Sequence, residues 1–233
     1  MDLSHIDFVG VAFQMIAFLF AISVHESAHA WTANRCGDPT ARMLGRISLN
    51  PIVHIDPVGT IVMPLIALFT HFPVIGWAKP TPVDPRNFKN AVRDDILTAV
   101  AGPVSNFLVA GGTVALMLMI AKTSAHGSFL VKGLAQYGPG FAQVAGTSFL
   151  VPLTLFFYEL MWINVVLAVF NLIPVPPLDG SHVLRHFLSD STRRVYDAMG
   201  IFGLLALVYL GGNLLSRLIS PFMEFFTGVL ARF

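Results

Sequence analysis

The sequence predicts an all-α polytopic membrane protein with about four transmembrane helices, a re-entrant or irregular membrane segment, and one helix broken by prolines. Of its 233 residues, 55% are hydrophobic and only 12% are charged, and the mean hydropathy is +0.72. A typical soluble domain carries about twice that share of charged residues. Several apolar runs also reach the length of about 20 residues that a helix needs to cross the hydrocarbon core of a bilayer.

Charge and cysteine content exclude several classes of function and site. The formal net charge is +1, and no cluster of basic residues offers a surface for nucleic acid. The single cysteine, Cys36, excludes an internal disulfide and a thiolate metal cage, so a bound metal would need imidazole and carboxylate ligands. The N-terminus lacks the basic region of a cleavable signal peptide, and we expect the first apolar run to be retained.

The first predicted span covers residues 8–36 and contains the motif SVHESAHAW, residues 23–31, near its C-terminal end. Its apolar run, residues 8–24, contains two polar residues, Gln14 and Ser23, and Gly37 provides a stop for the helix. The sequence therefore places a cluster of ionisable side chains within, or at the end of, a helix that is suited to lipid.

The next segment, residues 51–78, can be interpreted as a full crossing or as a re-entrant hairpin. Its apolar stretch is interrupted by Gly59, Pro64, Pro73 and Gly76. Loops on the cytoplasmic side of a membrane are enriched in Lys and Arg. A crossing divides the 14 basic residues seven to seven, whereas a hairpin places ten on one side and four on the other. We therefore expect the segment to re-enter, with irregular backbone that protein or water covers.

Three further spans are predicted downstream. They cover residues 96–121, residues 149–188 and residues 195–216. The second of these is broken at NLIPVPPLDG, where three prolines and a glycine interrupt any regular helix. Residues 221–233 are typical of an amphipathic tail at the membrane interface. No internal repeat or soluble domain is recognisable, and residues 1–233 are expected to form a single transmembrane domain.

Two histidines four residues apart, His25 and His29, project from one face of the first predicted helix, with Glu26 beside them. A zinc ion with three protein ligands activates water for hydrolysis, and a neighbouring glutamate can accept the proton. A chance helical pattern is the alternative. It is less compatible with an apolar span, because ionisable groups at membrane depth are costly.

A third ligand is required, and Asp179 is the best candidate. It is the one carboxylate in the proline-broken stretch, and it precedes Gly180. If segment 51–78 re-enters, the spans that carry His25 and Asp179 run in the same direction, so that their polar ends share one depth. The alternative is an ordinary Asp-Gly turn at a helix end, and the spacing leaves both interpretations open.

The motifs HESAH and FNLIPVPPLDG together resemble the signatures of the site-2 protease family of intramembrane zinc metallopeptidases. The stretches GRISLNPIVHIDPVGT, GWAKPTPVDPRNFKN and AGPVSN are also similar to the short prokaryotic members of that family, which lack a PDZ domain. The resemblance extends from about Ser23 to Leu184 and covers most of the chain. It places the broken helix at the expected active site.

The resemblance implies a role for five residues. His25, His29 and Asp179 would bind one zinc ion, and Glu26 would act as the general base. Asn171 would lie near the substrate carbonyl or the metal, where an amide donor can stabilise the tetrahedral oxyanion.

Three further residues are possible supporting groups, each with a structural alternative. His54 could line the site or lie in a loop at the interface. His182 could contact a metal ligand or face water at the start of a helix. Asn106 follows the pair Gly102-Pro103 and is expected to bond to backbone that the proline leaves unpaired.

We thus expect a metalloendopeptidase of the prokaryotic cell membrane, with its active site nearer the cytoplasmic face. Its expected partners are membrane-spanning protein or peptide substrates and the lipid bilayer, with no nucleic acid and no regulatory PDZ domain in the chain. Two alternatives come from other classes of function. They are a membrane metal-ion transporter and a catalytically inactive protein that binds membrane segments.

Overall fold

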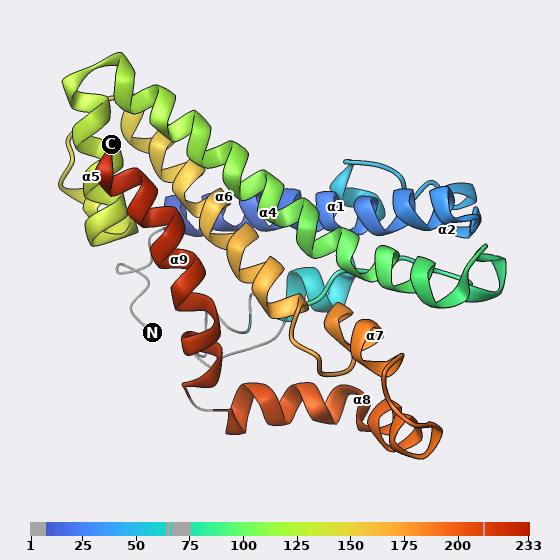
Figure 1. Ribbon diagram of the computed structural model, residues 1–233. Helices are drawn as coiled ribbons and strands as arrows, with labels where there is room; N and C mark the ends of the chain where they lie inside the picture. Colours follow the sequence, from blue (N-terminus) through green and yellow to red (C-terminus); the bar gives the residue numbers. More distant parts are fainter. Residues whose placement is uncertain (1–7, 64–65, 67–75, 212) are drawn as a thin grey trace. The chain divides into compact units, whose positions relative to one another are not determined.

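The computed structural model describes residues 8–63, 66, 76–211 and 213–233, and every long regular element in this part of the chain is an α-helix (Figure 1). The α-helices are α1 (Phe8–Cys36), α2 (Thr40–Met43), α4 (Ala91–Thr123), α5 (Ala125–Tyr137), α6 (Leu150–Asn171), α7 (Asp179–Arg185), α8 (Asp190–Leu210) and α9 (Leu214–Arg232). Short 3₁₀ or π turns are η2 (Pro51–Val53), η3 (Pro57–Val62), η4 (Pro85–Asn87) and η5 (Pro139–Gln143).

Four of the described helices, α1, α4, α6 and α9, are long and apolar enough to cross a membrane. This confirms the predicted fold class. The chain forms two compact units, and α1 and α4 each continue from one unit into the other. Unit 1 comprises Met1–Ala21, Asn106–Asn171 and Ile201–Phe233, and unit 2 comprises Ile22–Ser105 and Leu172–Gly200.

Unit 1 is a helical bundle with an apolar core. Helix α9 packs against α5 and α6, as the red, yellow-green and orange helices of Figure 1 show. The largest fully buried side chains of this core are those of Met117, Leu134, Met161 and Leu230. Burial of apolar side chains from four helices, the C-terminal part of α4 included, stabilises this unit.

The helix boundaries near the C-terminus differ from the prediction. The predicted span over residues 195–216 corresponds to α8, which is interrupted at Gly200 (φ 46°, ψ −135°), and α8 is not among the four candidate spans. The predicted amphipathic tail over residues 221–233 is instead the second half of α9. Pro221 lies inside α9, where packing against α5 and α6 tolerates the loss of one backbone hydrogen bond.

In unit 2, the two ends of the predicted re-entrant segment lie against each other. The Trp77 amide donates to Gly59 O (3.2 Å), and the buried Thr60 hydroxyl donates to Trp77 O (2.8 Å). Trp77 thus lies beside Gly59 and Thr60, which favours the re-entrant alternative. Residues 64–65 and 67–75 lie outside the described residues, so the course of the segment stays a prediction.

The end of α1 is tied to a distant loop by Asp38. Helix α1 stops at Cys36, and Gly37 adopts a positive φ of 118°, as the sequence predicts for a helix end. The fully buried Asp38 carboxylate accepts hydrogen bonds from the amide and hydroxyl of Thr40, from the Asp84 amide (2.7 Å) and from the Asn87 side chain (2.9 Å). One carboxylate therefore holds segment 84–87 beside the C-terminus of α1.

These bonds make the stability of unit 2 depend on pH. Burial of the Asp38 carboxyl raises its pKa, but the hydrogen bonds from Thr40, Asp84 and Asn87 outweigh burial and hold the pKa below its usual value. A carboxyl with a depressed folded pKa stabilises the fold above the unfolded pKa of about 3.9. This stabilisation is lost as the pH falls through the folded pKa.

We expect Asp38→Asn to lower the free energy of unfolding by about 1 to 3 kcal/mol at pH 7, because an amide NH₂ would face the Asp84 amide and leave it unpaired. The difference from the wild type should shrink as the pH falls from about 4 through the folded pKa of Asp38, because the unfolded chain and then the folded protein bind the proton. Unfolding in detergent at several pH values measures both effects. Asp190→Asn is the matched control, because the Asp190 side chain is 80% exposed and, among the described residues, it pairs with Arg193 alone. An equal loss in both variants would contradict the prediction.

Candidate active site

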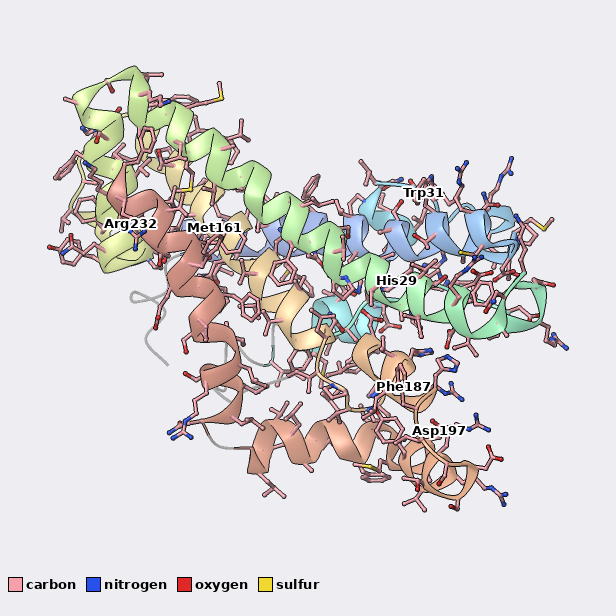
Figure 2. The ribbon with its side chains drawn as sticks, in the orientation of Figure 1. His29, Trp31, Met161, Phe187, Asp197 and Arg232 are labelled. Carbon is pink, nitrogen blue, oxygen red and sulfur yellow. The ribbon has the colours of Figure 1, made fainter. Side chains whose placement is uncertain are left out.

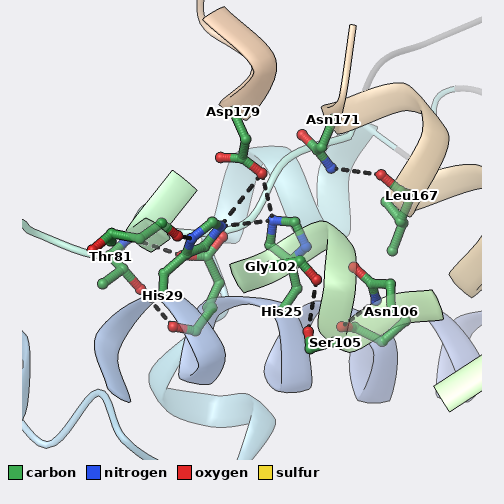
Figure 3. A network of polar contacts seen from close by, with 12 residues as sticks. His25, His29, Thr81, Gly102, Ser105, Asn106, Leu167, Asn171 and Asp179 are labelled. Carbon is green, nitrogen blue, oxygen red and sulfur yellow. Dashed lines mark hydrogen bonds and ion pairs between the residues drawn. The ribbon is translucent and has the colours of Figure 1, made fainter. Parts of the chain in front are cut away.

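Helix α1 and the start of α7 bring three potential metal ligands together (Figure 3). The Nε2 atoms of His25 and His29 are 3.0 Å apart. Asp179 Oδ2 lies 3.2 Å from His25 Nε2 and 3.4 Å from His29 Nε2. The i, i+4 spacing of the histidines accounts for their approach, because residues one helical turn apart share a face. Asp179, the first residue of α7, reaches them from a segment 150 residues further along the chain.

The orientation of His29 is set by α4. Its Nδ1 atom lies 2.7 Å from Thr98 O, and a hydrogen bond to this carbonyl requires that Nδ1 carry the proton. The Nε2 lone pair is then free to bind a metal. Trp31, two residues further along α1, is 55% exposed and lies on another face of the helix, with the Arg35 guanidinium 5.7 Å from its ring centroid (Figure 2).

Space for the two imidazoles comes from Gly102 in α4. A Cβ atom at this position would contact His29 Nε2, and it would lie 2.6 Å from His25 Cε1 and 2.7 Å from His25 Nε2. Real Cβ atoms essentially never approach another heavy atom so closely. The glycine therefore allows α4 to pack against the ligand-bearing face of α1.

The three side chains fit a zinc ion. Asp179 Oδ2 is buried, and no group in the described part of the chain donates a hydrogen bond to it. Two imidazole nitrogens and a carboxylate oxygen are a common donor set for zinc. Ligand atoms at about 2.0 Å from zinc in a tetrahedron lie about 3.3 Å apart, close to the separations found here. Within the described residues, this is the one group of side chains that meets the geometry of a metal site.

Comparison with known proteins identifies the family. A model of peptidase family M50 matches residues 13–210, which is most of the chain. The chain belongs to peptidase family M50. A Bacillus subtilis (strain 168) protein named "Putative zinc metalloprotease YwhC" is 35% identical over 84% of this chain and 78% of that protein. No solved structure shows significant similarity to the chain.

Two more distant relatives of this M50 peptidase are mycobacterial proteins named "Putative zinc metalloprotease Rip2". The protein from Mycolicibacterium smegmatis is 27% identical over 88% of this chain and 69% of its own length. The protein from Mycobacterium tuberculosis strain H37Rv is 28% identical over 87% of this chain and 68% of its own length. The resemblance that the HESAH and LDG motifs indicated is confirmed. This M50 peptidase is a zinc metalloprotease of the site-2 type and an integral membrane protein.

The predicted general base of the M50 peptidase, Glu26, has one neighbour that sequence reasoning missed. The Thr81 amide donates to Glu26 Oε2 (2.9 Å), and the Thr81 hydroxyl donates to the Glu26 backbone carbonyl (3.0 Å). Thr81 lies in the motif GWAKPTPV, which signalled the family but carried no residue-level assignment.

Sequence reasoning also missed Asp95 of α4, which contacts His182 of α7 and His186 just after it. The Asp95 side chain is only 11% exposed, and its carboxylate lies 3.3 Å from His182 Nδ1 and 2.7 Å from His186 Nε2. His182 is therefore paired with a carboxylate rather than directed only at water, although 45% of its side chain is exposed. The contact fixes the helix that begins with Asp179. An acidic pair at the start of an apolar run, Asp94-Asp95, was the available signal.

The other predicted site residues have hydrogen-bond partners within their own unit. His54 is fully buried, and its Nε2 lies 2.8 Å from Ser48 O in the same loop; a role in lining the site stays a prediction. Asn106 donates to Asn164 Oδ1 (2.7 Å) and Ala21 O (3.2 Å) within unit 1, the latter a backbone carbonyl of α1. Asn171 also belongs to unit 1, and its place beside the metal ligands stays a prediction.

Proposed function

We propose that this M50 peptidase is an endopeptidase that hydrolyses peptide bonds within or beside membrane-spanning segments of other proteins, as in regulated intramembrane proteolysis. One observation carries the proposal. The ligand pair His25 and His29 lies on a helix that is long and apolar enough to cross a membrane, and it meets Asp179 there. A hydrolytic site held by such a helix suits substrates that are themselves in the membrane.

The chain would hold one zinc ion through His25, His29 and Asp179. When bound, zinc supplies a Lewis acid that polarises the scissile carbonyl and lowers the pKa of water. The Glu26 carboxylate accepts the proton of the attacking water and returns it to the leaving amine. His29 keeps its proton on Nδ1 through the bond to Thr98 O, so its Nε2 stays available as a ligand.

Asn171 would stabilise the oxyanion that forms on the substrate. Its Nδ2 donates to Leu167 O (3.0 Å), one helical turn back in α6. To act on the substrate, the amide must exchange this bond for one to the oxyanion, whose larger negative charge makes it the stronger acceptor.

The substrate must be locally unwound at the cut. A helical peptide bond is shielded by its own hydrogen bonds and neighbouring side chains, so we propose that helix-breaking residues near the cut are preferred. The partners are then membrane-spanning proteins and the bilayer itself. From the distribution of basic residues, we place the site nearer the cytoplasmic face of a prokaryotic cell membrane.

The test uses purified protein in liposomes with a panel of tagged single-span membrane proteins. The Glu26→Gln variant at matched levels is the control, and mass spectrometry determines the new termini. We expect a fragment that ends within or beside the span, formed by the wild type alone, lost on chelation and restored by zinc. Zinc flux into the liposomes without any cleavage would instead favour a transporter and overturn the proposal.

A further inference from the structure

Thr81 contacts Glu26 at two points, although 55 residues separate them in the chain (Figure 3). The backbone N–H of Thr81 donates to the Glu26 carboxylate, and the hydroxyl donates to the Glu26 main-chain carbonyl. One contact orients the side chain, and the other aligns the Thr81 segment with the same turn of α1. These two hydrogen bonds therefore restrain the position of the Glu26 carboxylate relative to His25 and His29.

The local sequence leaves Thr81 as an isolated donor. It lies between Pro80 and Pro82, and proline has no backbone N–H. Thr81 thus supplies the one amide hydrogen among three consecutive residues. A residue before proline is also restricted to extended conformations, which stiffens the segment. Such a segment can present a single N–H to a carboxylate without a competing donor beside it.

The N-terminal side of this segment is held by buried groups of unit 2. The Lys79 amide donates to His54 O (2.9 Å), and the Thr60 hydroxyl donates to Trp77 O (2.8 Å). The Arg46 guanidinium reaches Lys79 O at 3.4 Å. Arg46 is 6% exposed, and His54 and Thr60 are fully buried. Segment 77–79 is therefore fixed just before Thr81.

The C-terminal side is held by Asp38. The Asp84 amide donates to Asp38 Oδ2 (2.7 Å), and Asp38 lies two residues after the end of α1. Segment 77–84 is thus attached on one side to the loop of residues 46–60 and on the other to the helix that carries Glu26. A backbone held at both ends can keep a hydrogen-bond donor at a fixed place.

We infer that Thr81 is a positioning residue for the general base Glu26 of the proposed peptidase, and that its N–H holds Oε2 so that Oε1 faces the water. Among the described residues, no hydrogen bond to Glu26 Oε1 is found, which leaves this oxygen for proton transfer. The inference rests on the proposed function for its catalytic consequence. The contact itself can be measured without any substrate.

The kinetic test compares three Thr81 variants and one control variant in the liposome assay. Thr81→Pro removes both bonds, and we expect kcat to fall about 100-fold with KM within about twofold, because a small misplacement of a catalytic group has an effect of this size. Thr81→Val keeps the N–H and should lose about tenfold in kcat. Thr81→Ser keeps both donors and should restore most of the activity. Zinc content should stay at the wild-type level throughout, because the ligands are untouched.

Val83→Pro is the matched control. It also extends the run of prolines, but no described group accepts a hydrogen bond from the Val83 amide. We expect its kcat to remain near that of the wild type. The inference is overturned if Val83→Pro loses as much activity as Thr81→Pro, or if Thr81→Pro retains the wild-type kcat.

Hydrogen exchange measures the contact independently of proteolysis. Because Pro80 and Pro82 have no amide, the Thr81 signal is isolated in a peptide resolved by mass spectrometry. We expect Glu26→Ala to speed exchange at Thr81 at least about tenfold and to leave the Lys79 amide unchanged. Equal Thr81 rates in the two proteins would refute the contact. If the Thr81 amide is protected by Glu26 but the protein cleaves no substrate, the contact is upheld and only the proposed function is refuted.

Discussion

Gly102→Ala is expected to weaken zinc binding by about 10- to 100-fold while the fold remains intact. A Cβ atom at this position would meet the ring of His29 and would lie 2.6 Å from His25 Cε1. Both imidazoles lie at the ends of side chains that can move, so the helices need not separate. Displacement of the rings would, however, spoil the ligand geometry, and disturbed support of ligands reduces metal affinity by this factor.

Competition with a chromophoric chelator measures the zinc affinity, and thermal unfolding in detergent measures the stability. Gly111→Ala is the matched control, because it lies in the same helix α4 and its added Cβ would meet nothing within 4 Å. Gly111→Ala should be at least as stable as the wild type, since alanine is the better helix former. Gly102→Ala should stay folded, with the gain in helix propensity offset by the displacement of the two rings. Zinc affinity that falls equally in both variants, or in neither, would contradict the assignment of the metal site.

Glu26→Gln is expected to reduce kcat by about 10³-fold with an unchanged zinc content. The amide keeps an oxygen that can accept the Thr81 hydrogen bond, so the local structure is preserved. It cannot accept the proton of the attacking water, and general base catalysis contributes about 10² to 10⁴ to the rate. The variant therefore separates proton transfer from metal binding.

Single-turnover cleavage of a liposome substrate, with zinc measured in the same sample, tests this prediction. Glu224→Gln makes the same chemical change at an exposed position of α9 and should leave the rate unchanged. If Glu26→Gln cleaved as fast as the wild type, another group would have to be the base. If Glu26→Gln lost its zinc, the slower cleavage would be due to a damaged metal site and not to the loss of proton transfer.

Local patterns were sufficient to predict the helices and the histidine pair. Apolar runs of sufficient length predicted the helices that became α1, α4 and α6, because a lipid span needs only length and low polarity. His25 and His29 share a face because the helical repeat places residues i and i+4 together. The C-terminal boundaries could not be predicted, because whether Gly200 breaks a helix and whether Pro221 is tolerated depend on packing.

By itself, the sequence determined the class of protein, the two-histidine face with its glutamate, and the resemblance to a family. Only the tertiary structure brought Asp179 beside the histidine pair, and it alone revealed Thr81 beside Glu26 and Asp95 beside His182. Each of these contacts joins residues at least 55 positions apart. Helical periodicity extends over a few residues, whereas such contacts depend on how distant segments pack, which no local spacing encodes.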